Sequence, residues 1–244
     1  NLVNAYGMDA LEHLLFSGSD TVCPSQVPPV SDGSWVALGE SGINTNRASY
    51  AKALTAELAL RADELIELWS VEEGGFSSSL SDQVESGAYG TEQAALTAVF
   101  HAMFYLEKTT KDLKLGQPMG LGACEGSICP DDLEGIVSQR SLDSIVDNML
   151  GFQEAFTGGE GVGFDDLLVD VGHSDLSESI LEDVEAFLSV AESFDGTLYD
   201  AISMGSDQLD PLYAALSSVT RALKVDMVTV LSLTVPAEAS GDND

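Results

Sequence analysis

The chain has 244 residues and a formal net charge of −32, from 41 acidic and 9 basic residues. Contacts with nucleic-acid phosphates or with an anionic membrane surface need clustered Lys and Arg, so this balance argues against both partners. With 44% hydrophobic residues, the chain can bury a core and is too apolar for a wholly disordered protein. The acidic residues are spread along the chain, which fits either a solvated acidic surface or a surface that attracts cations.

The sequence carries several indications of an exported protein. No stretch is long and apolar enough to span a membrane, and the chain begins without Met or a signal-peptide pattern, so we expect a processed mature form or a fragment. Cys124 and Cys129 bracket the loop CEGSIC, whose ends can meet as a disulfide. A metal knuckle is the alternative and would need further ligands. Cys23 would be free or paired outside the chain.

The first half of the chain alternates between helical periodicity and loop composition. Leucines at helical spacing predict a helix over residues 2–16. Residues 17–46 are rich in Gly, Ser, Pro and Asp and have no period, which predicts a long loop. Helical periodicity returns over residues 47–70. Thr91 is a suitable N-cap for a further helix, which should continue to about residue 113.

A break rich in Gly and Pro over residues 114–135 is the best boundary, so we predict domains at 1–115 and 116–244. The following stretches have helical spacing and predict helices over residues 141–158, 164–169, 174–191 and 209–231. Alternation at period two is almost absent, so no sheet is predicted. The sequence therefore predicts an all-α fold made of helical bundles.

The first predicted helix carries the one cluster that indicates chemistry. Asp9, Glu12 and His13 follow Gly7 within about one helical turn, and residues three and four apart share a helix face. Carboxylates with an imidazole can bind a divalent or ferric metal ion, although one helical turn seldom completes a site. Further ligands would come from elsewhere in the chain: Glu57, Glu85, Glu92 or His101. The same pattern also fits a surface helix on which the carboxylates bind backbone or Arg side chains and His13 is exposed.

Several motifs resemble those of the imelysin family. Residues 7–16, GMDALEHLLF, resemble the family's G-x-H-x-x-E signature and the apolar segment after it. Residues 47–69 resemble its R-x-x-Y…W helix, and residues 112–120 its D-x-K-L-x-x-P-x-G turn. Residues 140–164 resemble its S-x-R-S-L…G…G-L/F segment, and residues 241–244 are similar to its C-terminal end. The order of these matches covers nearly the whole chain.

The resemblance implies an all-helical fold of two bundle-like domains, with the signature in a pocket near the domain interface. It also implies a place in the bacterial cell envelope, as a periplasmic protein or a lipoprotein. Some family members are tied to iron regulation or uptake, and others were named peptidases. The family carries a helical stretch before the signature. We therefore expect an upstream segment or a partner chain to complete the bundle of residues 1–115.

The chain departs from the family signature at one ligand position. It has Asp9 where the signature has His, and it keeps Glu12. An Asp oxygen is a harder ligand than a His nitrogen, so iron or calcium, or no cation, becomes more plausible than zinc. The sequence thus predicts a non-enzymatic envelope protein that binds a metal ion or small ligand through Asp9, Glu12 and His13, with Gly7 supporting the motif. The alternatives are a metallopeptidase with Glu12 as general base and a partner-binding helical scaffold.

Overall fold

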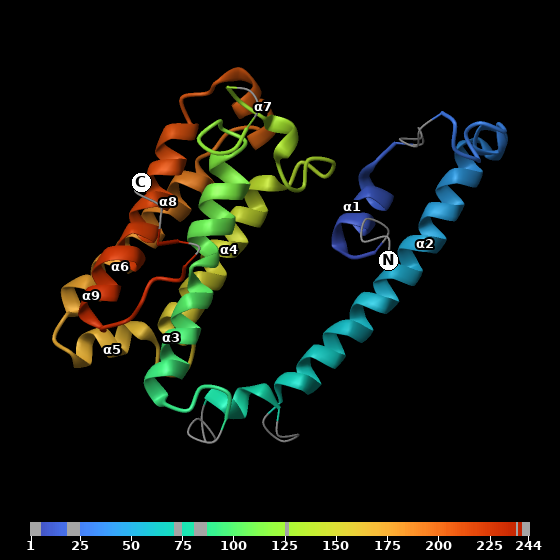
Figure 1. Cartoon of the computed structure of the whole chain (residues 1–244). Helices are drawn as coiled ribbons and strands as arrows, with labels where there is room; N and C mark the ends of the chain where they lie inside the picture. The colour runs from blue at the N-terminus through green and yellow to red at the C-terminus, as the bar shows by residue number, and fades with distance from the viewer. Residues whose placement is uncertain are drawn as a thin grey trace. The chain divides into compact units, whose positions relative to one another are not determined.

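The chain forms two compact units (Figure 1). The computed structural model describes residues 6–18, 25–70, 75–80, 87–124, 127–237 and 239–240. Unit 1 is Asn1–Ser78 and unit 2 is Ser79–Asp244. The predicted boundary at residues 115 and 116 instead falls at the end of a helix, η3 (Leu106–Gly116), inside unit 2. The Gly- and Pro-rich stretch after it is a loop between helices that pack in the same unit.

The described residues form helices and contain no strand, which confirms the predicted all-α class. Within that part of the chain, no helix has the length and apolar character needed to cross a membrane.

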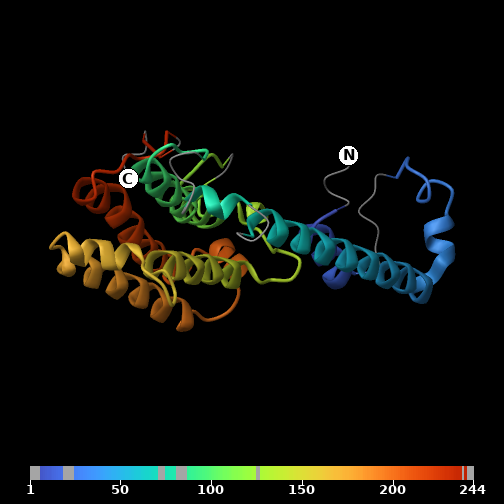
Figure 2. The ribbon, with the colours of Figure 1, turned by 90° about the horizontal axis from the view of Figure 1, so that it is seen from below.

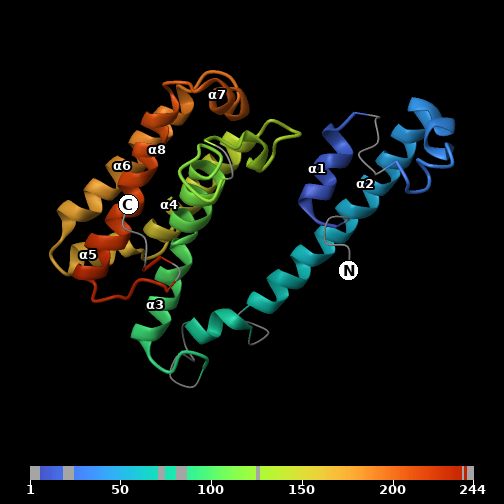
Figure 3. The same cartoon turned by 45° about the horizontal axis from the view of Figure 1, so that its top comes forward.

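Unit 1 consists of a short helix, α1 (Met8–Phe16), packed against a long helix, α2 (Ser34–Trp69) (Figure 3). Ala10 is the buried residue of α1. The buried residues of α2 recur at helical spacing and are Ile43, Arg47, Ala51 and Leu54. This spacing places the four residues on one face of α2, and α1 packs against α2. One of the four, Arg47, is charged.

The start of α2 shows that the predicted loop over residues 17–46 was wrong in its second half. The helix begins at Ser34, and Gly39 interrupts it with φ 64° and ψ 168°, a backbone conformation that is essentially restricted to glycine. Ile43 is the first buried residue of α2, so the first turns have no apolar stripe that periodicity could detect. A 3₁₀ turn, η2 (Phe76–Leu80), lies at the boundary between the units.

Unit 2 is a four-helix bundle with additional short helices (Figures 1 and 2). Helix α3 (Glu92–Met103) is followed closely by η3, which is a π-helix. Helix η3 packs on α4 (Ser141–Thr157), α4 on α6 (Ser174–Glu192), α6 on α8 (Leu209–Arg221), and α8 back on η3, which closes the ring. The remaining elements are η4 (Pro130–Asp132), α5 (Phe164–Asp170), α7 (Leu198–Met204), the π-helix η5 (Ala222–Met227) and α9 (Val228–Val230).

Local sequence signals account for several boundaries in unit 2. The Thr91 hydroxyl accepts a hydrogen bond from the Ala94 amide at 3.1 Å, which confirms the predicted N-cap. Cys124 and Cys129 are joined by a disulfide with a Cα–Cα distance of 6.0 Å, the pairing that their spacing predicts. Helix α7 was not predicted, although Thr197 gives a local signal for it: its hydroxyl caps the helix by accepting from the Asp200 amide at 3.1 Å. Cys23 lies outside the described residues.

The core of unit 2 draws on all four bundle segments. Its fully buried side chains include Phe100, Leu115, Ile145, Met149, Phe156, Val184, Phe187, Leu212, Leu216, Val219 and Leu223. Burial of this much aliphatic and aromatic surface is the main source of stability for a bundle in a highly charged chain.

Two neighbouring residues of α4 provide a matched test of this core. Met149 is 0% exposed and Leu150 is 45% exposed. Met149→Ala should lower the free energy of unfolding by about 2–5 kcal/mol, because it leaves a cavity. Leu150→Ala should lower it by about 1 kcal/mol or less. Urea unfolding followed by far-UV circular dichroism measures both values, and equal losses would show that the core is misassigned.

Candidate functional site

Helix α1 carries the predicted site residues directly after Gly7. Gly7 has φ 92°, which side-chain-bearing residues rarely adopt, and its carbonyl accepts the Leu11 amide at 3.2 Å. Asp9 is exposed, whereas Glu12 and His13 are half-buried. The spacing of three and four residues therefore places the two carboxylates and the imidazole at the surface of one short helix, as predicted.

The imidazole of His13 is oriented by a neighbouring hydroxyl. Its Nδ1 lies 2.7 Å from the Ser17 Oγ, one turn further along. Because this contact occupies Nδ1, a ligand of the neutral ring would bind at Nε2.

Arg47 of α2 fixes the C-terminal end of α1. Its Nε donates to the Leu14 carbonyl at 3.0 Å, and its Nη1 and Nη2 donate to the carbonyls of Gly18 and His13. The last carbonyls of a helix have no partner within the helix, and positive charge is favourable at that end. Arg47 is only 9% exposed, so these contacts replace the water that its guanidinium loses. This residue positions the signature helix, a role that its place in the R-x-x-Y motif did not predict.

The other predicted ligand donors have different surroundings. The Nε2 of His101 lies 2.7 Å from the Thr234 carbonyl, so this ring ties α3 to the C-terminal segment of unit 2. Glu57 pairs with Arg61 at 2.7 Å, and Glu92 lines a largely apolar cavity of about 680 Å³ in unit 2. Glu85 lies outside the described residues.

No three His, Cys, Asp or Glu side chains in the described part of the chain are grouped so that they could hold a metal ion. Coordination at α1 would therefore need side-chain rotation, together with water or further donors.

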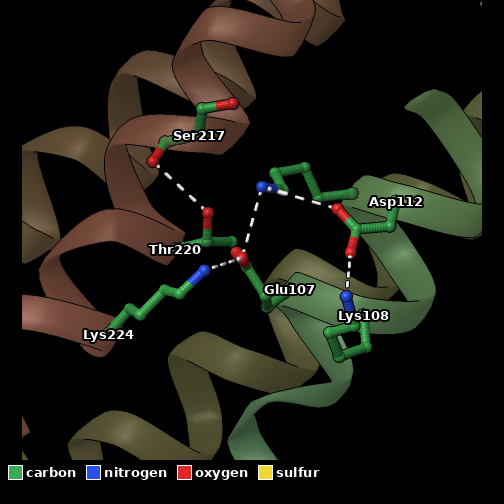
Figure 4. Close-up of polar contacts among 7 residues, drawn as sticks. Glu107, Lys108, Asp112, Ser217, Thr220 and Lys224 are labelled. Atoms are coloured by element: carbon green, nitrogen blue, oxygen red, sulfur yellow. Dashed lines mark hydrogen bonds and ion pairs between the residues drawn. The ribbon is translucent and has the colours of Figure 1, made fainter. Parts of the chain in front are cut away.

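The D-x-K-L residues, 112–115, lie on helix η3. Their side chains make hydrogen bonds and ion pairs with other parts of unit 2. The Nζ of Lys114 contacts a Glu134 carboxylate oxygen at 2.7 Å, and it donates at 2.9 Å to both Ser144 and Asn148 of α4. Asp112 accepts from Lys108 at 2.6 Å, which Figure 4 shows. Burial raises the pKa of the Asp112 carboxyl above its ordinary value, while the hydrogen bond from Lys108 acts in the opposite direction.

A comparison with protein-family models now identifies the family. The model described as imelysin matches residues 1–223, which include the signature on α1 and the D-x-K-L turn. The chain belongs to the imelysin family. Comparisons with curated proteins and with solved structures gave no match. In this family member, Arg47 thus holds the end of the signature helix, and Asp9 stands at the position where the signature has His.

Removing the Arg47 charge tests how α1 is held. Arg47→Met keeps an apolar stem and loses all three donated hydrogen bonds. Loss of hydrogen bonds from a buried charged group should accelerate amide exchange in α1 by about tenfold to a hundredfold in hydrogen-exchange mass spectrometry. The control is Arg61→Met, on the same helix, whose exposed ion pairs with Glu57 and Glu64 do not involve α1. Equal exchange in both variants would contradict this role of Arg47.

The ion pair in η3 can be tested by titration. Since the hydrogen bond from Lys108 lowers the pKa of Asp112, Lys108→Met should raise that pKa further. A raised pKa favours folding at pH values below the unfolded pKa of the carboxyl, and this contribution is lost as the pH rises through the folded pKa. The variant should therefore lose more stability at neutral than at acidic pH. Carboxyl ¹³C NMR measures the pKa, and Lys52→Met, at an exposed position of α2, should leave it unchanged.

Proposed function

We propose that this imelysin is a non-enzymatic binding protein in which α1 supplies Asp9, Glu12 and His13 to a metal ion or a small ligand. The observation that carries the proposal is the placement of three ligand-type side chains on one helix whose end is fixed by Arg47. A helix held in this way fixes the backbone positions of the three donors, so a ligand has to order only their side chains, which lowers the entropic cost of binding.

The chemistry of the donors favours a hard cation. Asp9 and Glu12 offer oxygen ligands, and His13 can add one nitrogen through Nε2. The net charge of −32 raises the cation concentration near the surface and favours cation capture over anion capture at this exposed helix. A divalent or ferric ion is the ligand that fits these groups best.

Membership of the imelysin family and the disulfide in unit 2 support a location in the bacterial cell envelope, either in the periplasm or as a lipoprotein. Iron acquisition is the process that such a metal-binding envelope protein would serve.

The donor count favours binding over peptide hydrolysis. A catalytic zinc site uses three protein ligands together with a water molecule, and a general base in addition. If Glu12 acted as the base, α1 would retain only Asp9 and His13 as ligands. A peptidase site would therefore need a further ligand from outside this helix.

Calorimetry with the full chain tests the proposed site. Ca²⁺ and Mn²⁺ are titrated into protein freed of metal with a chelator. The wild type should bind about one ion per chain at a site that the double variant Asp9→Asn/Glu12→Gln loses. The matched control is Asp63→Asn/Glu67→Gln, which removes the same charge from exposed positions of α2. Equal weakening in the two double variants would show diffuse attraction by the acidic surface instead of a site at α1.

A degradation assay on an unfolded substrate separates the proposal from the peptidase alternative. The wild type should leave the substrate intact with each metal. Cleavage by the wild type that disappears in Glu12→Gln would overturn the non-enzymatic proposal.

A further inference from the structure

Helix α2 extends well beyond the residues that it buries in unit 1. Figure 3 shows α1 alongside the earlier part of this helix. The buried residues of α2 end at Leu54, whereas the helix continues to Trp69, about 22 Å further at a rise of about 1.5 Å per residue. Every residue from 59 to 69 is exposed. We refer to residues 58–69 as the distal segment of α2.

The distal segment carries an apolar stripe along one face. Leu65 follows Leu58 by seven residues, and Trp69 follows Leu65 by four, a spacing that places the three side chains on one side of a helix. Ala51 and Leu54, which are buried, lie seven and four residues before Leu58 and therefore share that side. The stripe thus continues the buried face of α2 past the part of the helix that lies beside α1.

The large apolar side chains of this stripe are open to solvent. Leu65 is 64% exposed, Ile66 67% and Trp69 51%. The ring centroids of Trp69 and Phe76 lie 5.3 Å apart, so Trp69 keeps half of its surface exposed even with this aromatic contact. Exposed apolar patches mark interaction sites, and Trp is enriched among the residues that dominate binding energy. The stripe therefore has the character of a docking surface for another helix.

The charges beside the stripe define the kind of partner. Residues 57–69 contain four acidic residues and one basic residue, a net charge of −3. They are Glu57, Asp63, Glu64, Glu67 and Arg61, and Arg61 pairs with Glu57 and Glu64 of its own helix at 2.7 Å. A second copy of the chain would bring the same acidic residues and a net charge of −32 to the contact, which is repulsive. A partner with basic residues is attracted instead.

We propose that the distal segment of α2 docks an amphipathic helix of a partner protein, with Lys or Arg on both sides of the apolar face of that helix. The apolar side chains of the partner pack on the stripe at Leu65, Ile66 and Trp69. Its cations reach the carboxylates of Asp63 on one side of the stripe and Glu64 on the other. An apolar stripe with anchors at helical spacing is the usual way in which one helix recognises another. The proposal does not depend on metal binding at α1.

Fluorescence of the full chain tests the docking. Trp35→Phe leaves Trp69 as the one tryptophan of the chain, so its emission reports on the stripe. The probe is a peptide of Leu and Lys, about 18 residues long to favour a helix, with the leucines at helical spacing. It should shift the emission of Trp69 to shorter wavelengths and protect the indole from acrylamide, because apolar side chains replace water at the ring.

Two further peptides separate the contributions of charge and pattern. A Leu/Glu peptide keeps the apolar pattern, and a scrambled Leu/Lys peptide keeps the charge without an apolar face. Each should bind at least about tenfold more weakly than the patterned Leu/Lys peptide. Equal binding of either peptide, no binding of the patterned peptide, or an indole that is already protected from acrylamide in the free chain would overturn the proposal.

Two leucines of the distal segment provide matched variants. Leu65 lies in the stripe, whereas Leu60 lies on the opposite face and is 51% exposed. Leu65→Asp and Leu60→Asp add the same negative charge, and neither removes a buried side chain. Leu65→Asp should weaken binding of the Leu/Lys peptide by at least about tenfold, and Leu60→Asp should leave it unchanged. Equal affinity in the two variants would indicate diffuse attraction by the acidic surface and contradict the proposal.

Sedimentation velocity decides whether a second copy takes this face. The wild type should remain a monomer at micromolar concentrations, because the acidic residues beside the stripe repel those of another chain. A dimer that Leu65→Asp dissociates and Leu60→Asp leaves intact would assign the surface to a second copy and overturn the proposal of a basic partner.

Discussion

The scarcity of positive charge is the constraint on which this structure depends. With 9 basic residues against 41 acidic ones, each buried or half-buried cation that joins two elements contributes strongly to how those elements pack. Arg47 joins α2 to the end of α1, Lys114 joins η3 to α4, and Lys224 joins η5 to η3 through Glu107. Breaking a buried pair by removing one partner leaves an uncompensated charge, which is far more costly than the net value of the pair. The positions of Arg47, Lys114 and Lys224 therefore help to determine which helices pack against each other.

The basic residues of the two units make different kinds of contact. On α1, Arg47 donates its hydrogen bonds to the backbone carbonyls of His13, Leu14 and Gly18. In unit 2, the Nζ atoms of Lys111 and Lys224 lie 3.3 Å and 3.4 Å from the same carboxylate oxygen, Oε1 of Glu107, and the Lys111 Nζ also lies 3.4 Å from Asp112.

The features that could be predicted from the sequence are those that depend on residues close to one another in the chain. Helices with an apolar stripe, the Thr91 cap and the pairing of Cys124 with Cys129 all follow from residues within a few positions of one another. The first turns of α2 were not predicted because they bury almost no apolar side chains, so they show no helical period. The role of Arg47 was not predicted because capping the end of another helix leaves no local signature. The contact of Lys224 with Glu107 was not predicted because the two residues are 117 positions apart. The placement of Asp9, Glu12 and His13 on one helix was predictable, whereas a complete ligand set was not.

The most direct test of cation binding at α1 is paramagnetic broadening in NMR spectra of the full chain. Mn²⁺ added below one equivalent broadens the signals of nuclei near its binding site. A site at α1 predicts that the amides of residues 7–13 broaden before those of α6, which is also acidic and exposed but lacks the signature. Broadening that is equal in the two helices, or stronger in α6, would contradict the site at α1.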